Sequence, residues 1–343
     1  MNMKKLLFIF LANLFSLAIS AQTTKIDSGK VDWITLEQAK AKFAEKQKPI
    51  LIYITDNKAE SKAMEDTTFK LYEVTNYMNV RFYCVKIDAY TKEKITYMDG
   101  QVFENKTGGM HDFAKFILGQ ETKFPAMVLL NVDGYGASYF GYKDRDAIFP
   151  ILIYTSENVY RTTTYEDWFA HYDKTYPSKN TKGYTMTRSL VKWLTFEEAQ
   201  EKNKVEKRKF FVDIYANWVV GATVMFIATY NNPEVAKILN EKYYPIRLNA
   251  LDRDTIEVHG IKYFNRGNGN TYHDLPVAML EGKMNFPAFL ILNEEILPLS
   301  KYANFASSSS LEAILTFFYQ DKYKTEIYKD FFEKFIKEKE KKN

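Results

Sequence analysis

The sequence repeats itself at an interval of about 160 residues, and this constrains its fold more than any other feature. The segment V-D-W-I-T-L-E-Q-A near the start returns as V-K-W-L-T-F-E-E-A, in which Trp193 stands where Trp33 stood. In each copy a threonine followed three residues later by Gln or Glu predicts a capping box at the start of a helix. A repeat of this length predicts two copies of one domain.

Two further pairs of matching segments follow in the same order. The apolar runs at 50–54 and 210–215 have the length and the β-branched and aromatic content of buried strands. The segments at 80–89 and 244–250 predict a second strand in each copy. Before the latter, N-P-E-V-A-K-I-L-N-E predicts a helix with a proline in its first turn.

The strongest match is an ungapped stretch that begins at His111 and again at His273. Both copies contain F-P-A, and the two prolines, Pro125 and Pro287, head a further predicted strand. The copies also end alike, because the closing helical segment of the first half returns in the second. We therefore expect domain 1 over residues 22–177 and domain 2 over residues 185–343, joined by the polar linker 178–184.

This order of elements resembles the thioredoxin fold, and more closely the exported thioredoxin-like proteins of Bacteroidetes-type bacteria. In those proteins W-x-T-x-E-E-A opens the domain, V-D-x-Y-A-x-W-C-x-x-C-K-x-M carries the redox turn, and a [YF]-P pair precedes the last part of the sheet. The second half matches at Trp193, Thr195, Glu198, Asp213, Trp218, Met225, Tyr272, His273, Phe286 and Pro287, and the first half at Trp33, Met64, His111, Asp112, Phe124 and Pro125. The resemblance implies an α/β protein of two tandem thioredoxin-like domains, each a central mixed β-sheet flanked by helices, with a C-terminal helical extension.

The chain departs from the family at the redox turn. The two cysteine positions hold Val219 and Ala222 in the second half, and Lys58 and Ser61 in the first. Disulfide exchange needs an accessible thiolate and a second thiol that resolves the mixed disulfide. Valine and alanine supply neither, and Ser61 is a hydroxyl with no evident base beside it in the sequence. We therefore expect no catalytic residues, no metal and no cofactor.

The resemblance also suggests where a polypeptide would bind. Pro125 and Pro287 resemble the family's cis-proline, beside which catalytic relatives pair with an extended peptide. The alternative is that each proline only starts its strand and closes the core. Phe124 and Phe286 precede the prolines, and Trp218 precedes the second turn. Trp218 and Phe286 are expected either to form an apolar contact patch or to pack against the C-terminal segment.

Three polar residues invite functional roles that the sequence does not support. Asp213 matches the family's buried carboxylate, whose role in proton transfer lapses without a resolving cysteine, so we expect a structural residue satisfied by a neighbour. His111 and His273 stand at equal positions, but no second His or Cys lies at a metal-ligand spacing. Helix capping or a core hydrogen bond is the expected role of both histidines.

The chain has a single cysteine, Cys84, so it cannot form an internal disulfide. Cys84 lies in a predicted interior strand, where a buried and inert thiol is expected. An intermolecular disulfide or a redox role for this thiol is the alternative.

The first 21 residues have the features of a signal peptide. Lys4 and Lys5 precede an apolar run that ends in small residues suited to cleavage; a membrane-spanning anchor is the alternative. Without these two lysines the formal charge falls from +4 to +2 (4 − 2), which does not favour nucleic acid as a partner. We expect an exported protein, periplasmic, outer-membrane associated or secreted, with no membrane segment after cleavage.

Three functions remain in competition. The first is a non-catalytic thioredoxin-fold binding or scaffold protein of the bacterial envelope that engages exported polypeptide partners. The second is a thiol–disulfide oxidoreductase or isomerase acting through Cys84 or a partner's thiol. The third is a peptide-binding chaperone, which differs from the first in holding its partner transiently. The oligomeric state and the identity of the partner stay open.

Overall fold

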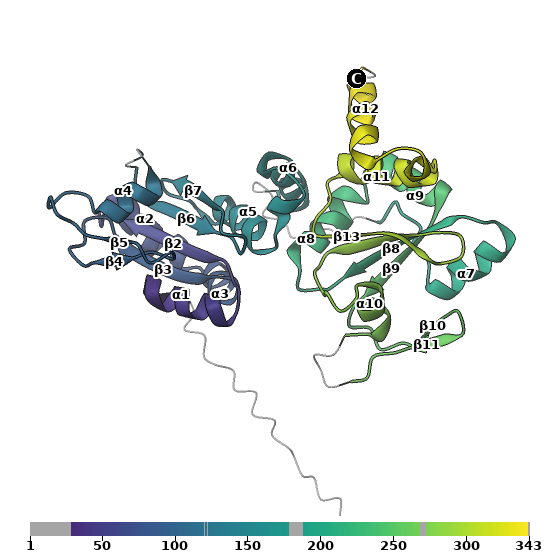
Figure 1. Cartoon of the computed structure of the whole chain (residues 1–343), viewed down its shortest axis with the longest axis horizontal. Helices are drawn as coiled ribbons and strands as arrows, with labels where there is room; N and C mark the ends of the chain where they lie inside the picture. The colour runs from purple at the N-terminus through teal and green to yellow at the C-terminus, as the bar shows by residue number, and fades with distance from the viewer. Residues whose placement is uncertain (1–28, 120, 122, 178–187, 268–271, 342–343) are drawn as a thin grey trace, which may run out of the picture.

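The computed structural model of the chain describes residues 29–119, 121, 123–177, 188–267 and 272–341. The expected signal peptide 1–21 and the expected linker 178–184 lie outside the described residues and stay predictions. Domain 1 below means the described residues up to 177, and domain 2 those from 188 onward. Figure 1 shows the two as separate α/β units with helices α5 and α6 between their sheets.

Domain 1 is built on a five-stranded mixed sheet in the order β1-β3-β2-β6-β7. β1, β3 and β2 run parallel, while β6 and β7 are each antiparallel to the strand before them in that order. The strands are β1 Trp33–Ile34, β2 Ile50–Thr55, β3 Tyr83–Asp88, β6 Ala126–Leu130 and β7 Gly136–Phe140, with a separate hairpin of β4 Ile95–Thr96 and β5 Val102–Phe103. The helices are α1 Leu36–Glu45, α2 Ala59–Asp66, α3 Tyr72–Arg81, α4 Asp112–Leu118, α5 Arg145–Ser156 and α6 Tyr165–Thr175, with 3-10 turns η1 Thr68–Lys70 and η2 Val159–Arg161.

Domain 2 repeats this plan with a four-stranded sheet in the order β13-β12-β8-β9. A single parallel bridge from Leu194 to Ile246 stands where domain 1 has β1. The strands are β8 Lys209–Tyr215, β9 Tyr243–Asn249, β12 Ala288–Leu292 and β13 Pro298–Ala303, with the hairpin β10 Ile256–Val258 and β11 Ile261–Tyr263. The helices are α7 Phe196–Val205, α8 Val220–Val224, α9 Pro233–Lys242, α10 Asp274–Met279, α11 Ser308–Tyr319 and α12 Tyr328–Glu340, with the π-helical turn η3 Met225–Thr229 and the 3-10 turn η4 Lys322–Lys324.

The strand order and directions are those of the thioredoxin fold, so the predicted fold class is confirmed. The two central strands of domain 1, β2 and β6, are buried along their whole length, as their apolar runs predict. Both predicted capping boxes are present, from Thr35 with Gln38 and from Thr195 with Glu198. Among the described residues, no helix combines the length and the apolar character that a membrane crossing requires.

One strand begins later than its sequence predicts. The segment 80–89 reads as a strand throughout, but its first two residues form the last turn of α3, and β3 begins at Tyr83. Val80 is 59% exposed, so it lies on the solvent face of the helix instead of in the core. The apolar character of a short segment does not by itself separate a helix end from a strand start.

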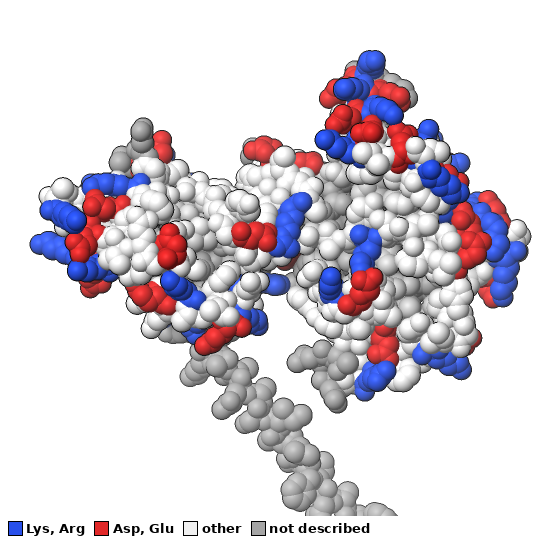
Figure 2. Space-filling model, in the orientation of Figure 1, with Lys and Arg blue, Asp and Glu red and all other residues white. Residues whose placement is uncertain are grey.

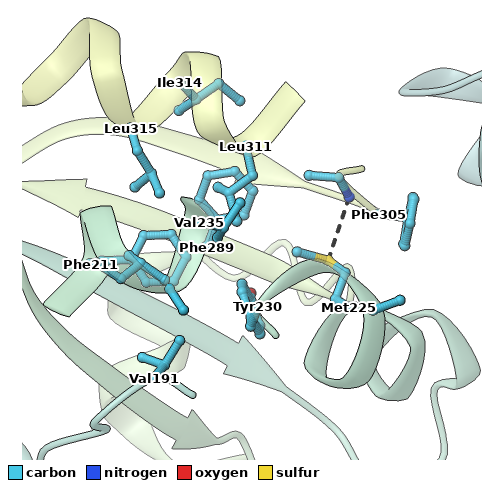
Figure 3. Packing of buried hydrophobic residues seen from close by; sticks show 14 of the residues in the cluster. Val191, Phe211, Met225, Tyr230, Val235, Phe289, Phe305, Leu311, Ile314 and Leu315 are labelled. Atoms are coloured by element: carbon cyan, nitrogen blue, oxygen red, sulfur yellow. Dashed lines mark hydrogen bonds between the residues drawn. The ribbon is translucent and has the colours of Figure 1, made fainter. Parts of the chain in front are cut away.

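The two domains share one hydrophobic core cluster. Ile153 of α5, Val159 of η2 and Trp168 of α6 pack with the domain 2 core that includes Met225 and Phe305. Figure 3 shows the domain 2 part of this cluster, where the dashed line joins the Met225 sulfur to a backbone amide 3.5 Å away. Helix α6, the closing helix of domain 1, therefore covers apolar residues of domain 2.

Candidate functional site

The turn after strand β8 is the place where a thioredoxin-fold enzyme would carry its cysteines. Trp218 and Val219 follow the strand, and Val219 is the N-cap of α8. Val219 and Ala222 are only 6% and 4% exposed, so neither faces solvent. We call residues 218–224 the turn end of domain 2.

A carboxylate from domain 1 closes this turn end. Glu157 follows the last residue of α5, and its two oxygens accept the backbone N–H groups of Val220 and Gly221 at 3.0 and 2.7 Å. The first N–H groups of a helix lack partners within the helix and carry its positive end, so a carboxylate is the acceptor that suits them. Burial raises the pKa of the Glu157 carboxyl, while the two amide donors and Arg81 oppose that rise.

Gly221 lies where domain 1 and the proline loop of domain 2 meet. A methyl group added to Gly221 would lie 3.1 Å from an oxygen of Glu157 and 3.5 Å from Cδ of Pro287. The small residue therefore allows the carboxylate to reach the helix. These two close contacts explain why position 221 holds a glycine.

Further contacts join domain 1 to domain 2. Arg81 of α3 donates from its guanidinium to the carbonyl oxygen of Trp218 at 3.4 Å. On α6, His171 accepts the backbone N–H of Ser308 at 3.1 Å, at the start of α11. The ring of Trp168 meets the ring of Phe305 edge to face at a centroid distance of 5.1 Å. These contacts and the shared core join the two domains.

An aromatic cluster lies beside the closed turn end. Trp218 is 46% exposed, and its ring centroid lies 6.5 Å from Tyr272 and 6.4 Å from Phe286. Phe286 itself is largely buried. Trp218 was expected either to form an apolar patch with Phe286 or to pack against the C-terminal segment. In the structure its ring lies in a partly exposed cluster with Phe286. The backbone carbonyl of Trp218 accepts a hydrogen bond from Arg81 of domain 1.

The turn of domain 1 is built differently, from residues that bond to one another. Lys58 is the N-cap of α2 and its side chain is 75% exposed. Ser61 is buried, and its hydroxyl donates to the carboxylate of Asp56 at 2.7 Å. The expectation that no base stands beside Ser61 is therefore wrong. Although partial burial works against it, hydrogen bonds from Ser61 and from the Lys58 amide lower the pKa of Asp56, which makes it a weak base.

The turn end of domain 1, residues 57–63, is open where that of domain 2 is closed. Ala59 and Glu60 stand at the positions of Val220 and Gly221 and are exposed. Among the described residues, nothing accepts a hydrogen bond from the backbone N–H of Ala59 or Glu60. The side chain of Glu60 accepts the amide of Tyr142 instead, at 2.8 Å.

The proline loops of both domains are formed alike. The bonds Phe124–Pro125 and Phe286–Pro287 are cis, and each proline carbonyl accepts the amide of the residue after the hairpin's second strand, Gly141 or Asn304, at 2.8 Å. The backbone N–H and C=O of Phe124 and of Phe286 have no hydrogen-bond partner among the described residues. In domain 1, the ring of Tyr90 lies 6.4 Å from that of Phe124 and is 42% exposed.

Asp213 lies in the core of domain 2 with two partners. Its carboxylate accepts the hydroxyl of Tyr230 at 2.7 Å and the guanidinium of Arg247 at 3.0 Å. Burial raises the pKa of Asp213, and Arg247 opposes the rise. Arg247 itself lies 3.9 Å from the ring centroid of Tyr215 and 4.0 Å from that of Phe226. The carboxylate is thus fully engaged by neighbouring side chains.

The two repeated histidines cap helices. The Nδ1 atoms of His111 and His273 accept backbone amides at the starts of α4 and α10, at 3.0 and 3.1 Å. Because Nδ1 accepts, Nε2 carries the proton and donates to the carbonyls of Glu93 and Asp254, at 3.0 Å in each case. Both rings are fully buried. No cluster of metal-ligating side chains is present in the described part of the chain.

The single thiol lies in the core of domain 1. Cys84 is 2% exposed on strand β3, and its Sγ donates to the carbonyl of Met78 at 3.8 Å. Burial raises the pKa of Cys84 to about 12. A thiol with this pKa is almost wholly protonated at neutral pH, and only the thiolate attacks disulfides.

Sequence reasoning missed Glu157, the residue that closes the turn end of domain 2. One signal was present: the repeat pairs Glu157 with Gln320, at the end of an apolar helix where a carboxylate has no local partner. The contact itself joins residues that are 64 positions apart in different copies of the repeat. A pattern within one copy cannot predict it.

Comparison with known proteins adds distant likenesses. No family model matches the chain, and no curated protein matches it. A thioredoxin-fold protein from Helicobacter pylori is 13% identical to this chain with a TM-score of 0.32, and the alignment covers 40% of this chain and 87% of the Helicobacter chain. A disulphide isomerase from Xylella fastidiosa Temecula1 is 10% identical with a TM-score of 0.23, covering 47% of this chain and 98% of its own. The alkylhydroperoxide reductase protein AhpF of Enterococcus faecalis is 12% identical with a TM-score of 0.22, covering 81% of this chain and 96% of its own.

Proposed function

We propose that the chain is a non-catalytic binding protein, a scaffold of the bacterial envelope that engages extended segments of polypeptide partners. Two observations support the absence of redox chemistry. The four turn positions hold Lys58, Ser61, Val219 and Ala222, none of which is a thiol. The one thiol is buried and has a raised pKa.

The proline loop of domain 1 supports polypeptide binding best. The N–H and C=O of Phe124, unpaired within the part of the chain that the structure describes, offer the pairing groups that an extended peptide uses when it adds to a backbone edge. The half-exposed ring of Tyr90 offers an apolar contact for a side chain of that peptide. In domain 2, the matching turn end is already occupied by Glu157. The backbone groups of Phe124, which have no hydrogen-bond partner among the described residues, and the exposed residues of the domain 1 turn end are the observations that carry the proposal.

A binding measurement with an unfolded polypeptide tests it. The probe is a reduced and carboxymethylated polypeptide that carries a fluorescent label, and the variant is Tyr90→Asp. The matched control is Tyr135→Asp, because Tyr135 is 75% exposed and lies in the turn after strand β6, whereas Phe124 and Pro125 precede that strand. We expect Tyr90→Asp to raise the Kd by about tenfold or more, which is 1.4 kcal/mol, and Tyr135→Asp to leave it unchanged. Absence of binding by the wild type, or equal binding by both variants, contradicts the proposal.

The enzyme alternative makes the opposite prediction. If Cys84 exchanged disulfides, the wild type would accelerate the reduction of a disulfide-bonded protein by dithiothreitol, and Cys84→Ala would not. We expect both to match the uncatalysed rate, since the thiol is 2% exposed.

The chaperone alternative differs in how long the labelled polypeptide stays bound. A chaperone would release this polypeptide within the time of the binding assay, whereas a scaffold retains it in stoichiometric amounts.

The envelope location is part of the same proposal and is supported by the N-terminal segment alone. Cell fractionation tests it. We expect the mature protein to begin near Gln22 and to be recovered outside the cytoplasm. A cytoplasmic protein that retains its first residues contradicts it.

A further inference from the structure

Both domains close with the same pair of helices. In domain 1, α5 and α6 are joined through Asn158, whose φ is 55°, and in domain 2, α11 and α12 are joined through Asp321, whose φ is 56°. The ring pair Tyr154–Tyr165 has a centroid distance of 5.4 Å, and its counterpart Phe317–Tyr328 has one of 5.3 Å. Both pairs meet edge to face. The two helical hairpins are therefore built to one plan.

In domain 1 this hairpin forms one side of an occupied groove. The groove lies between α3, α5 and α6, and it holds the turn end of domain 2. Arg81 and Glu157 contact this turn end, and His171 of α6 contacts Ser308 at the start of α11. We call it the domain-1 groove.

The counterpart in domain 2 is open. A groove of about 560 Å³ lies between α9, α11 and α12. Its lining includes Lys242, Gln320, Phe331 and Lys334, which the repeat places at the positions of Arg81, Glu157, Trp168 and His171. Figure 1 shows α12 standing away from the body of domain 2. We call this groove the domain-2 groove.

The turn end that the domain-2 groove matches is that of domain 1. Within one chain, Val219, Gly221 and Ala222 of the domain 2 turn end are buried, whereas Ala59 and Glu60 of the domain 1 turn end are exposed. The N–H groups of Ala59 and Glu60 lack acceptors among the described residues, in the places where Val220 and Gly221 are capped. Gln320 donates its amide N–H to the hydroxyl of Tyr319, which leaves its carbonyl oxygen to accept.

The residues on both sides have changed together from apolar to charged. In the internal contact, Val220 packs against a cluster that includes Ile153 and Phe149, and Val219 precedes it as the N-cap of α8. In the open pair, Lys58 replaces Val219, and Glu312 replaces Phe149. Figure 2 shows basic and acidic side chains intermingled over α12 and its surroundings. The open groove therefore suits a charged turn end and not an apolar one.

We propose that the domain-2 groove binds the turn end of domain 1 from a second copy of this chain, so that copies associate head to tail. The contact repeats between chains what the domain-1 groove does within one. Because the two surfaces differ, the association is heterologous and gives rings or open chains of copies. It requires no polypeptide ligand and stands apart from the proposed function, although both use the domain 1 turn end and would compete for it.

Disulfide trapping tests the geometry. Ala59→Cys and Gln320→Cys are prepared as separate proteins, and the buried Cys84 provides a low background. We expect a rapid disulfide-linked dimer in the mixture of the two and not in either protein alone. The control pairs Gln320→Cys with Val205→Cys, since Val205 is 92% exposed on α7. Equal trapping in the control, or dimers of Gln320→Cys alone, overturns the proposal.

Sedimentation measures the association itself. We expect the average mass of the wild type to rise with concentration, and Gln320→Arg to weaken the association by about tenfold or more. The matched control, Gln101→Arg, changes an exposed glutamine on the β4–β5 hairpin and should associate like the wild type. A wild type that stays monomeric at every concentration overturns the proposal, as does equal association of the two variants.

Discussion

Removing the Glu157 carboxylate tests how strongly the closed turn end holds the domains together. In Glu157→Ala the N–H groups of Val220 and Gly221 lose their acceptors in a place where Glu157 is only 6% exposed. A buried donor left without a partner costs about 1–3 kcal/mol. Two donors cost about 2–6 kcal/mol, from which the recovered desolvation of the carboxylate is subtracted. We expect a net loss of about 2–4 kcal/mol in the free energy of unfolding.

Urea unfolding followed by tryptophan fluorescence measures this loss. Trp168 is fully buried at the interface and Trp218 lies beside it, so the signal reports on the contact. The control is Glu45→Ala, which changes an exposed glutamate at the end of α1 and should stay within about 0.5 kcal/mol of the wild type. If Glu157→Ala also unfolds within about 0.5 kcal/mol of the wild type, the carboxylate does not join the domains and the reasoning fails.

Four further outcomes are expected. Gly221→Ala destabilises the wild type, because its methyl group would lie 3.1 Å from an oxygen of Glu157. In the Glu157→Ala background the same substitution stabilises the protein by about 0.5–1 kcal/mol through its higher helix propensity. Urea unfolding curves of the wild type, the two single variants and the double variant measure both effects. Because the pKa of Glu157 is raised in the folded protein, its carboxyl loses its proton at a lower pH in the unfolded chain than in the folded one. The unfolding free energy therefore falls as the pH rises from the ordinary carboxyl pKa through the raised one. Unfolding curves recorded at a series of pH values should show a smaller fall for Glu157→Gln than for the wild type. Arg247→Met leaves the Asp213 carboxylate buried without its charge partner and costs about 3–5 kcal/mol in urea unfolding, whereas adding Asp213→Asn recovers part of the loss. A thiol reagent labels Cys84 at a rate that follows unfolding, and fast labelling of the native protein contradicts its burial.

The repeat made most of the fold predictable from the sequence. Trp33 and Trp193, the two F-P-A segments and the capping boxes recur in one order, and each depends on local physics that a sequence displays. The strand was predicted to start before Tyr83 because Val80 in the last turn of α3 and Phe82 after it continue the apolar alternation of the strand. The hairpin β4–β5 was not anticipated, since its strands are only two residues long.

The chemistry of the site was less predictable because it depends on contacts between distant residues. The partner of Ser61 is Asp56, which becomes a neighbour only when the turn folds back on itself. Glu157 meets Gly221 only after two complete domains have formed and packed together. Sequence alone showed that the thiols are absent, but not what now covers the place where they would be.

Amide hydrogen exchange of Val220 and Gly221 tests the central claim most directly, which is that domain 1 closes the turn end of domain 2. First-turn helix amides ordinarily exchange fast because they lack partners. We predict that these two exchange only with separation of the domains or global unfolding, while Ala59 and Glu60, their counterparts in domain 1, exchange fast in dilute protein. Fast exchange of Val220 and Gly221, at the rate of the domain 1 pair, would contradict the account.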